Sequence, residues 1–267
     1  MADIEKTRAV VEANETYDGK LIPTVQAELG RPVRIREGAT VQGGVYGETI
    51  DVDSDGTVEG SVMASDAIEL SDCHVQGEVG SPGKVVCDGV HVEGTVTGQR
   101  VRLTDCIVRG NVVGAQVILE NCIVLGITTS DEELTIEDSL CYTFRARGST
   151  TLMEVTTILP QVIADGPLDL QTPVSVAGLG PLDTGTNDDG QDLPQMTDED
   201  RYVQNDRTYL TLAPRILNLE KVTDRLEELE AAIMEIVADM NGEGPAEIDI
   251  DVVLSSLDID QAGFAVD

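Results

Sequence analysis

The chain alternates hydrophobic and polar positions in one short phrase that recurs between Val25 and Leu140. The phrase is Val-x-Gly-x-Val, as in Val58–Val62, and successive copies are 16 or 17 residues apart. A second phrase, apolar-x-apolar, runs between the copies in the same phase, as in Ile50–Val52. Both phrases have the two-residue period of a β-strand, and a fixed short repeat indicates one unit stacked on itself. We predict that each repeat is one coil of a β-helix, made of two or three very short strands.

Stacking the repeats in register predicts which side chains face the interior. Two columns are occupied by aliphatic residues, and we expect them to line the core: Val41, Val58, Val75, Val92, Val108, Val124, Ile50, Ile68, Val85, Val101 and Val117. A column of small residues from Ala39 to Cys122 and the glycine column from Gly43 to Gly126 are expected on the same inner side. Glycine suits a crowded interior or a corner with positive φ. Asp-Gly, Ser-Asp and Glu-Asn pairs supply the corners.

The range of the repeat, and the different pattern that follows it, predict an all-β chain with a helix near its C-terminal end. The parts are a flexible N-terminus (1–20), a main β-helix (21–145), its continuation or a second short β-helical block (146–179), an acidic linker (180–206), an amphipathic or coiled-coil helix (207–241) and an acidic tail (242–267). The helix is predicted from a heptad spacing of apolar residues. Its seam is Leu219, Val222, Leu226, Leu229, Ile233, Ile236 and Met240.

The outward columns change character along the β-helix. Early coils carry polar residues there, such as Gln42 and Glu59, whereas later coils carry apolar ones. The later residues are Ile107, Ile118, Ile123, Leu125 and Ile127. Apolar residues on adjacent coils form a patch, and we expect the patch to be an interface covered by the chain's own C-terminal part or by another subunit. The heptad seam is the matching candidate for that cover.

The net charge of −33 limits the kinds of molecule that the protein is expected to bind. Such an acidic surface repels nucleic acid and anionic membranes, so we expect no nucleic-acid partner. Strong self-repulsion in dilute buffer would be screened by salt, which favours a salt-loaded cytoplasm of the halophilic type. The first thirty residues show no secretory signal, and no apolar stretch is long enough for a transmembrane helix.

Metal-ligating and catalytic residue types are present, but their spacing favours a structural role. The five cysteines fall one per coil and never as Cys-x-x-Cys, so we expect buried reduced thiols. His74 and His91 stack in one outward column, which continues with threonine and isoleucine and offers no third ligand in phase. We find no Walker loop, no G-x-S-x-G and no H-E-x-x-H. We therefore expect no catalytic residue, no metal, no cofactor and no small-molecule substrate.

The repeated Val-x-Gly-x-Val units with apolar-x-apolar phrases between them resemble those of the bactofilins, which are polymer-forming cytoskeletal proteins, over roughly residues 21 to 145. The acidic composition is similar to that of their haloarchaeal relatives, the halofilins. The resemblance implies a right-handed β-helix and a cytoplasmic scaffold that self-associates, as a polymer or dimer, and contributes to cell shape. It also implies another bactofilin-like protein as a further partner and leaves open a peripheral contact with the inner face of the membrane.

An open solenoid end can add further coils, but the segments after residue 145 depart from the family pattern and could cap one end. Capping would convert a polymer former into a dimer or an accessory factor. The alternative function is a β-helical enzyme, either a hexapeptide-type acyltransferase or a carbonic-anhydrase-like protein. Those enzymes use coils of eighteen residues and a histidine set at a trimer interface, whereas this chain has a wavering period and two histidines.

Overall fold

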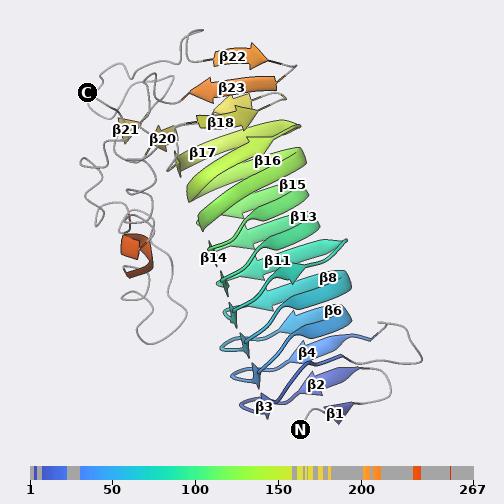
Figure 1. Ribbon diagram of the computed structural model, residues 1–267. Coiled ribbons are helices and arrows are strands. Elements are labelled where there is room, and N and C mark those ends of the chain that lie inside the picture. Colours follow the sequence, from blue (N-terminus) through green and yellow to red (C-terminus); the bar gives the residue numbers. More distant parts are fainter. Residues whose placement is uncertain are drawn as a thin grey trace. The chain divides into compact units, whose positions relative to one another are not determined.

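The computed structural model is an all-β protein built on a parallel β-solenoid (Figure 1). It describes residues 3–4, 8–22, 31–157, 161–164, 166, 168–170, 174–176, 180–181, 201–204, 207–211, 231–235 and 253. The solenoid residues fall into two compact units, one that ends at Ile118 and one that begins at Leu119.

The coils of the first unit have three walls of parallel strands. One wall consists of β4 (Val33–Ile35), β6 (Val45–Val52), β8 (Val62–Ser71), β11 (Lys84–Asp88), β13 (Val96–Thr104) and β15 (Val112–Glu120). A second consists of β3 (Thr16–Tyr17), β5 (Thr40–Val41), β7 (Thr57–Val58), β9 (His74–Val75), β12 (His91–Val92) and β14 (Ile107–Val108). The third wall joins the starts of β6 and β8 to β10 (Val79–Gly80) and to the start of β13.

The register of these strands stacks equivalent residues of successive coils. Val58 pairs with Val41 below it and with Val75 above it, and Val75 pairs with Val92. All eleven residues expected in the core are at most 2% exposed. The interior of the first unit is therefore a set of continuous aliphatic columns, each of which repeats the packing of the coil below.

One corner of each coil places a residue in the left-handed region of φ. These residues are Asn14, Gly38, Asp55, Asp72, Gly89, Asp105, Asn121, Asp138 and Glu154. Asparagine and aspartate tolerate this conformation better than other non-glycine residues. The glycine column from Gly43 to Gly110 has a different cause, because none of its members has positive φ. A Cβ on Gly77 would lie 2.6 Å from the carbonyl carbon of Gly60, so this column is fixed by close backbone stacking between coils at a half-buried corner and not by the lumen.

The N-terminal boundary of the solenoid differs from the sequence prediction. Residues 1–20 were expected to be flexible, yet β2 (Ala9–Val11) pairs in parallel with β4 and is fully buried. Tyr17, and not Val25, precedes Val41 in the valine column. The reason is that left-handed corners at Asn14 and Gly38 are 24 residues apart, whereas the next interval is 17, so the extra residues hide the first coil from a fixed-period search. The degenerate copy at Val25–Leu29 lies outside the described residues.

The second unit begins with the same parallel pairing. Its long strand β16 (Ile123–Ala146) pairs with β17 (Ser149–Thr157), and β17 pairs in parallel with β19 (Leu168–Leu170) and β20 (Val174–Val176). The interior here includes hydroxyl groups that make local hydrogen bonds. Ser139 Oγ donates to the carbonyl of Glu137 at 2.6 Å and accepts the backbone N–H of Cys122 at 3.0 Å.

Antiparallel strands then replace the parallel ladder. Strand β18 (Gln161–Ala164) pairs in parallel with β16 on one side and antiparallel with β23 (Arg207–Thr211) on the other. Strand β23 forms a hairpin with β22 (Arg201–Gln204), and β21 (Gly180–Pro181) pairs antiparallel with β20. The hairpin overlaps the ends of the predicted linker and the predicted helix, so the expectation was wrong for residues 201–204 and 207–211.

Most of the predicted helix lies outside the described residues, namely Leu219, Val222, Leu226, Leu229 and Ile236. A helical segment is described over residues 231–235, where Ile233 is buried. The tail after residue 242 is described at Val253 alone, which is also buried.

Candidate functional site

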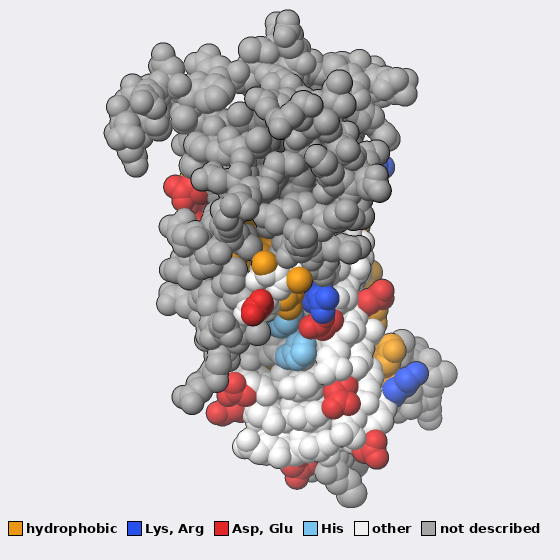
Figure 2. All heavy atoms as spheres, turned by 60° about the vertical axis from the view of Figure 1, so that its left-hand side comes forward, with side chains coloured by type: hydrophobic (Ala, Val, Ile, Leu, Met, Phe, Trp, Pro, Cys, Tyr) orange, Lys and Arg blue, Asp and Glu red, His pale blue; other side chains and the backbone are white. Residues whose placement is uncertain are grey.

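The outward neighbours of the valine column bring two histidines together. His74 in β9 pairs with His91 in β12, because parallel register places residues 17 positions apart on adjacent rungs. The two imidazole rings stack with centroids 4.9 Å apart and an angle of 28° between their planes. Figure 2 shows both histidines side by side on the surface of the solenoid.

A carboxylate from the adjacent column completes a cluster of three possible metal ligands. Glu93 follows β12 by one residue, so its side chain lies on the same outer face as that of His91. Its Oε1 atom lies 3.3 Å from His91 Nε2 and 3.6 Å from His74 Nε2. Its Oε2 atom accepts a hydrogen bond of 2.7 Å from Nη1 of Arg109 in the next coil. Arg109 therefore fixes the carboxylate and leaves Oε1 directed at the histidines.

The environment keeps this cluster partly withdrawn from water. The side chains of His91 and Glu93 are 25% and 27% exposed, and Nε2 of each histidine is inaccessible to solvent without a hydrogen-bond partner. Burial, together with the neighbouring His74, lowers the pKa of His91 below its ordinary value. Burial opposes ionisation of Glu93, but the hydrogen bond from Arg109 and the nearby histidines outweigh it and lower the pKa of that carboxyl. The cluster thus favours neutral His91 beside ionised Glu93.

Sequence reasoning paired the two histidines but missed the carboxylate. The search for a third ligand followed the histidine column alone, which continues as Ile107. The signal that could have found it is the two-residue period of a strand, since His91 and Glu93 share a face at i and i+2. The histidines are outward rungs of the wall, as the sequence predicts, but both Nε2 atoms are covered and lack a hydrogen-bond partner.

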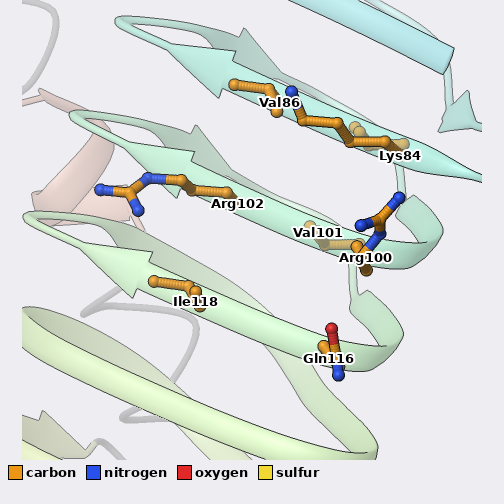
Figure 3. Close-up of a pocket in the computed structure, with 8 residues that line it drawn as sticks. Lys84, Val86, Arg100, Val101, Arg102, Gln116 and Ile118 are labelled. Carbon is orange, nitrogen blue, oxygen red and sulfur yellow. The ribbon is translucent and has the colours of Figure 1, made fainter.

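A shallow groove of about 230 Å³ lies on another wall of the first unit. Figure 3 shows Val86, Arg102 and Ile118 along one side of the groove and Lys84, Arg100 and Gln116 along the other, all carried by β11, β13 and β15. Three cations around one apolar depression are notable in a chain with 17 basic and 50 acidic residues. In the two coils before the groove the same wall carries Asp51 and Glu69, which pair in register with each other.

The residues predicted as an interface occupy different environments. Ile107 and Ile123 are buried, at 3% and 0% exposure, although strand alternation directs them away from the lumen. Ile118 and Leu125 are half-buried, and Ile118 lines the groove. Ile127 is 44% exposed. Of the helical seam, Ile233 alone is described, and it is buried.

None of the five cysteines forms a disulfide, and all five are buried. Burial raises the pKa of Cys73 to about 12 and also raises the pKa of Cys141. The Cys106 thiol donates to the carbonyl of Thr104 at 3.0 Å. At neutral pH Cys73 and Cys141 therefore stay protonated thiols, which are poor nucleophiles and poor metal ligands.

The described part of the chain contains no helix of the length and apolarity that a membrane span requires. Comparison with family models, with curated proteins and with solved structures finds no match. The structure defines the class of protein: a parallel β-solenoid with an aliphatic lumen, a polar cluster on one wall and a groove flanked by basic residues on another.

Proposed function

We propose that this protein is a non-enzymatic cytoskeletal scaffold of the bactofilin type, which self-associates through its β-helix and contributes to cell shape. The proposal includes right-handed winding, the C-terminal amphipathic helix and a salt-rich cytoplasm. It also includes a second bactofilin-like protein and the inner face of the membrane as further contacts. What supports it is the geometry of the two ends of the ladder of strands.

The observation that carries the proposal is the edge of the first coil. Strand β3 pairs with β5, and no other described strand pairs with it. The carbonyls of Glu15 and Tyr17 accept the N–H groups of Thr40 and Gln42, both at 2.9 Å. Because backbone groups alternate in direction along a strand, the N–H and C=O of Thr16 point to the opposite edge. Such an edge is a template for another coil.

The first coil is covered in part, because β1 (Asp3–Ile4) pairs antiparallel with β2, and the edge of β3 stays open among the described strands. The last coils differ, because β18 and β20 both carry antiparallel partners on their outer edges. Antiparallel strands end a parallel stack, since a further coil would need the same edge. The open edge of β3 and the covered edges of β18 and β20 favour a head-to-head dimer. In such a dimer the same surface of two copies meets, and growth stops. We therefore propose a dimeric scaffold joined through its first coils, with β21 and the β22–β23 hairpin limiting filament growth.

The test is the size of the full chain in about 2 M KCl, where the surface charge is screened. Sedimentation and negative-stain microscopy should show pairs of rods joined end to end. Thr16→Pro removes one outward N–H and should give monomers, whereas Thr16→Ala keeps the N–H and should still pair. Monomeric wild-type protein, or pairing that survives Thr16→Pro, would refute assembly through the first coil.

Removing the hairpin tests the second half of the proposal. A chain that lacks residues 201–211 should expose the edge of β18 and assemble into longer rods than the full chain. Assemblies of unchanged length would show that the hairpin does not limit growth.

A further inference from the structure

We propose that His74, His91 and Glu93 bind one divalent transition-metal ion of the zinc class on the outer wall of the solenoid. This site goes beyond the scaffold function, which does not require it. The three residues come from adjacent rungs and adjacent columns of one wall, so the fold itself brings them together. No catalytic step is assigned to the ion.

The distances suit a site that needs only a small closure. Zinc bonds of about 2.0–2.2 Å to nitrogen and oxygen in tetrahedral geometry separate two ligand atoms by roughly 3.3 Å. Glu93 Oε1 already lies 3.3 Å from His91 Nε2 and 3.6 Å from His74 Nε2. One ligand atom from each of the three residues lies within 4.8 Å of the other two. The stacked rings have to tilt toward each other, because the nitrogen lone pairs lie in the ring planes.

The two imidazole nitrogens are an independent observation that points to a ligand. Both Nε2 atoms are shielded from solvent and lack a hydrogen-bond partner, which is uncommon for buried polar atoms. Neither His–Glu contact meets the geometry of a hydrogen bond, so the carboxylate does not satisfy them. A cation bound between the three atoms would satisfy both nitrogens at once.

The ligand types select the class of ion. Two imidazoles and one carboxylate suit zinc, nickel, cobalt or copper ions, whereas magnesium and calcium prefer oxygen ligands throughout. Arg109 holds Glu93 Oε2, which orients the carboxylate as a one-oxygen ligand in the way that outer-shell groups orient metal ligands. Its positive charge opposes a dication locally, but the net charge of −33 attracts cations to the protein as a whole.

The experiment is a zinc titration of the full chain in about 2 M KCl, followed by long-range ¹H–¹⁵N correlation of the imidazoles. The chain has two histidines, so the spectrum holds two imidazole spin systems. We expect the Nε2 signals of both to shift together and to saturate at one ion per chain. Cobalt in place of zinc should give the visible absorption of a low-coordinate nitrogen and oxygen site.

Variants separate this site from general binding to the acidic surface. His91→Ala and Glu93→Gln should each weaken zinc binding by at least about tenfold. Glu59→Gln is the matched control, because Glu59 occupies the column of Glu93 on a coil without histidine, and it should bind as the wild type does. Imidazole signals that do not move in the wild type, or zinc affinity that is unchanged in His91→Ala, would overturn the proposal. These outcomes are independent of assembly size, so this proposal and the scaffold can fail separately.

Discussion

The lumen and the outer wall of the same short strands follow different rules. Strands β5, β7, β9, β12 and β14 each place a valine inside, and every one of these valines is fully buried. The residue just before it points outward and changes from threonine to histidine and then to isoleucine. The inner position must repeat because each side chain packs on its copy in the next coil. The outer position carries no such constraint, so its residue type is free to vary from coil to coil.

The largest expected effect is a loss of stability on substitution of Val58, which faces the lumen. Substitution of its neighbour Thr57 on β7, which faces outward, should have little effect. Val58→Asp would place an unpaired carboxylate in the aliphatic lumen and should lower the free energy of unfolding by at least about 4 kcal/mol. Val58→Ala should lower it by about 2 kcal/mol, whereas Thr57→Ala should change it by less than about 0.5 kcal/mol. Urea unfolding in high salt measures all three. Equal losses at the two positions would remove the distinction between lumen and wall.

A smaller loss of stability is expected for substitutions in the glycine column, which lies at a corner of each coil. Gly77→Ala would bring a methyl group to 2.6 Å from backbone atoms of Gly60 and Ser61 and should cost about 1–3 kcal/mol. Gly80→Ala is the matched control in the same coil, because its Cβ would meet the flexible side chain of Met63. That variant should lie within about 0.5 kcal/mol of the wild type. Thermal unfolding of the pair checks this, and a tolerant Gly77 would mean that the coils are less tightly stacked.

The smallest effect concerns charge on the outer wall and depends on pH. Burial and the neighbouring charge of Glu69 raise the pKa of Asp51, so the ionised carboxylate destabilises the folded state at neutral pH. Asp51→Asn should therefore stabilise the protein at pH 7, by no more than about 0.5 kcal/mol. The advantage should shrink as the pH falls through the raised pKa of Asp51 in the folded state, and it should vanish below the ordinary pKa of an aspartate. Urea unfolding of the wild type and of Asp51→Asn between pH 7 and pH 4 measures the difference in their stability. A difference that stays constant or grows as the pH falls would contradict a raised pKa of Asp51.

The regular coils could be predicted from the sequence because their information is periodic. Each valine from Val41 to Val108 occupies the same buried position in its coil, so every repeat gives the same alignment of inward and outward residues. The first coil escaped because the chain between Asn14 and Gly38 breaks the period. Its strands β2 and β3 are ordinary in composition, and only their pairing with β4 and β5 identifies them.

The hairpin and the carboxylate of the histidine cluster could not be predicted from the repeat, because their contacts join residues of different columns or lie outside the repeat. The strands β22 and β23 pair antiparallel and are separated in the sequence by the dipeptide Asn205-Asp206, a short polar spacing that is typical of hairpins, whereas we predict linker and helix there from the sequence. Glu93 joins the histidines from the next column, and Arg109 joins from the next coil, so neither is in phase with the pair. Interaction across columns becomes visible only when the coils are placed in space.

Disulfide trapping of outward residues tests most directly that coils stack in phase. Gln42 and Glu59 are exposed and 17 residues apart, and each follows a strand of the paired β5 and β7. Cα atoms on adjacent rungs are about 4.8 Å apart, which allows a disulfide. Gln42→Cys with Glu59→Cys should therefore oxidise to an intramolecular disulfide, while Gln42→Cys with Thr57→Cys, shifted by two residues, should not. Cross-linking of the shifted pair with failure of the in-phase pair would contradict the stacked solenoid.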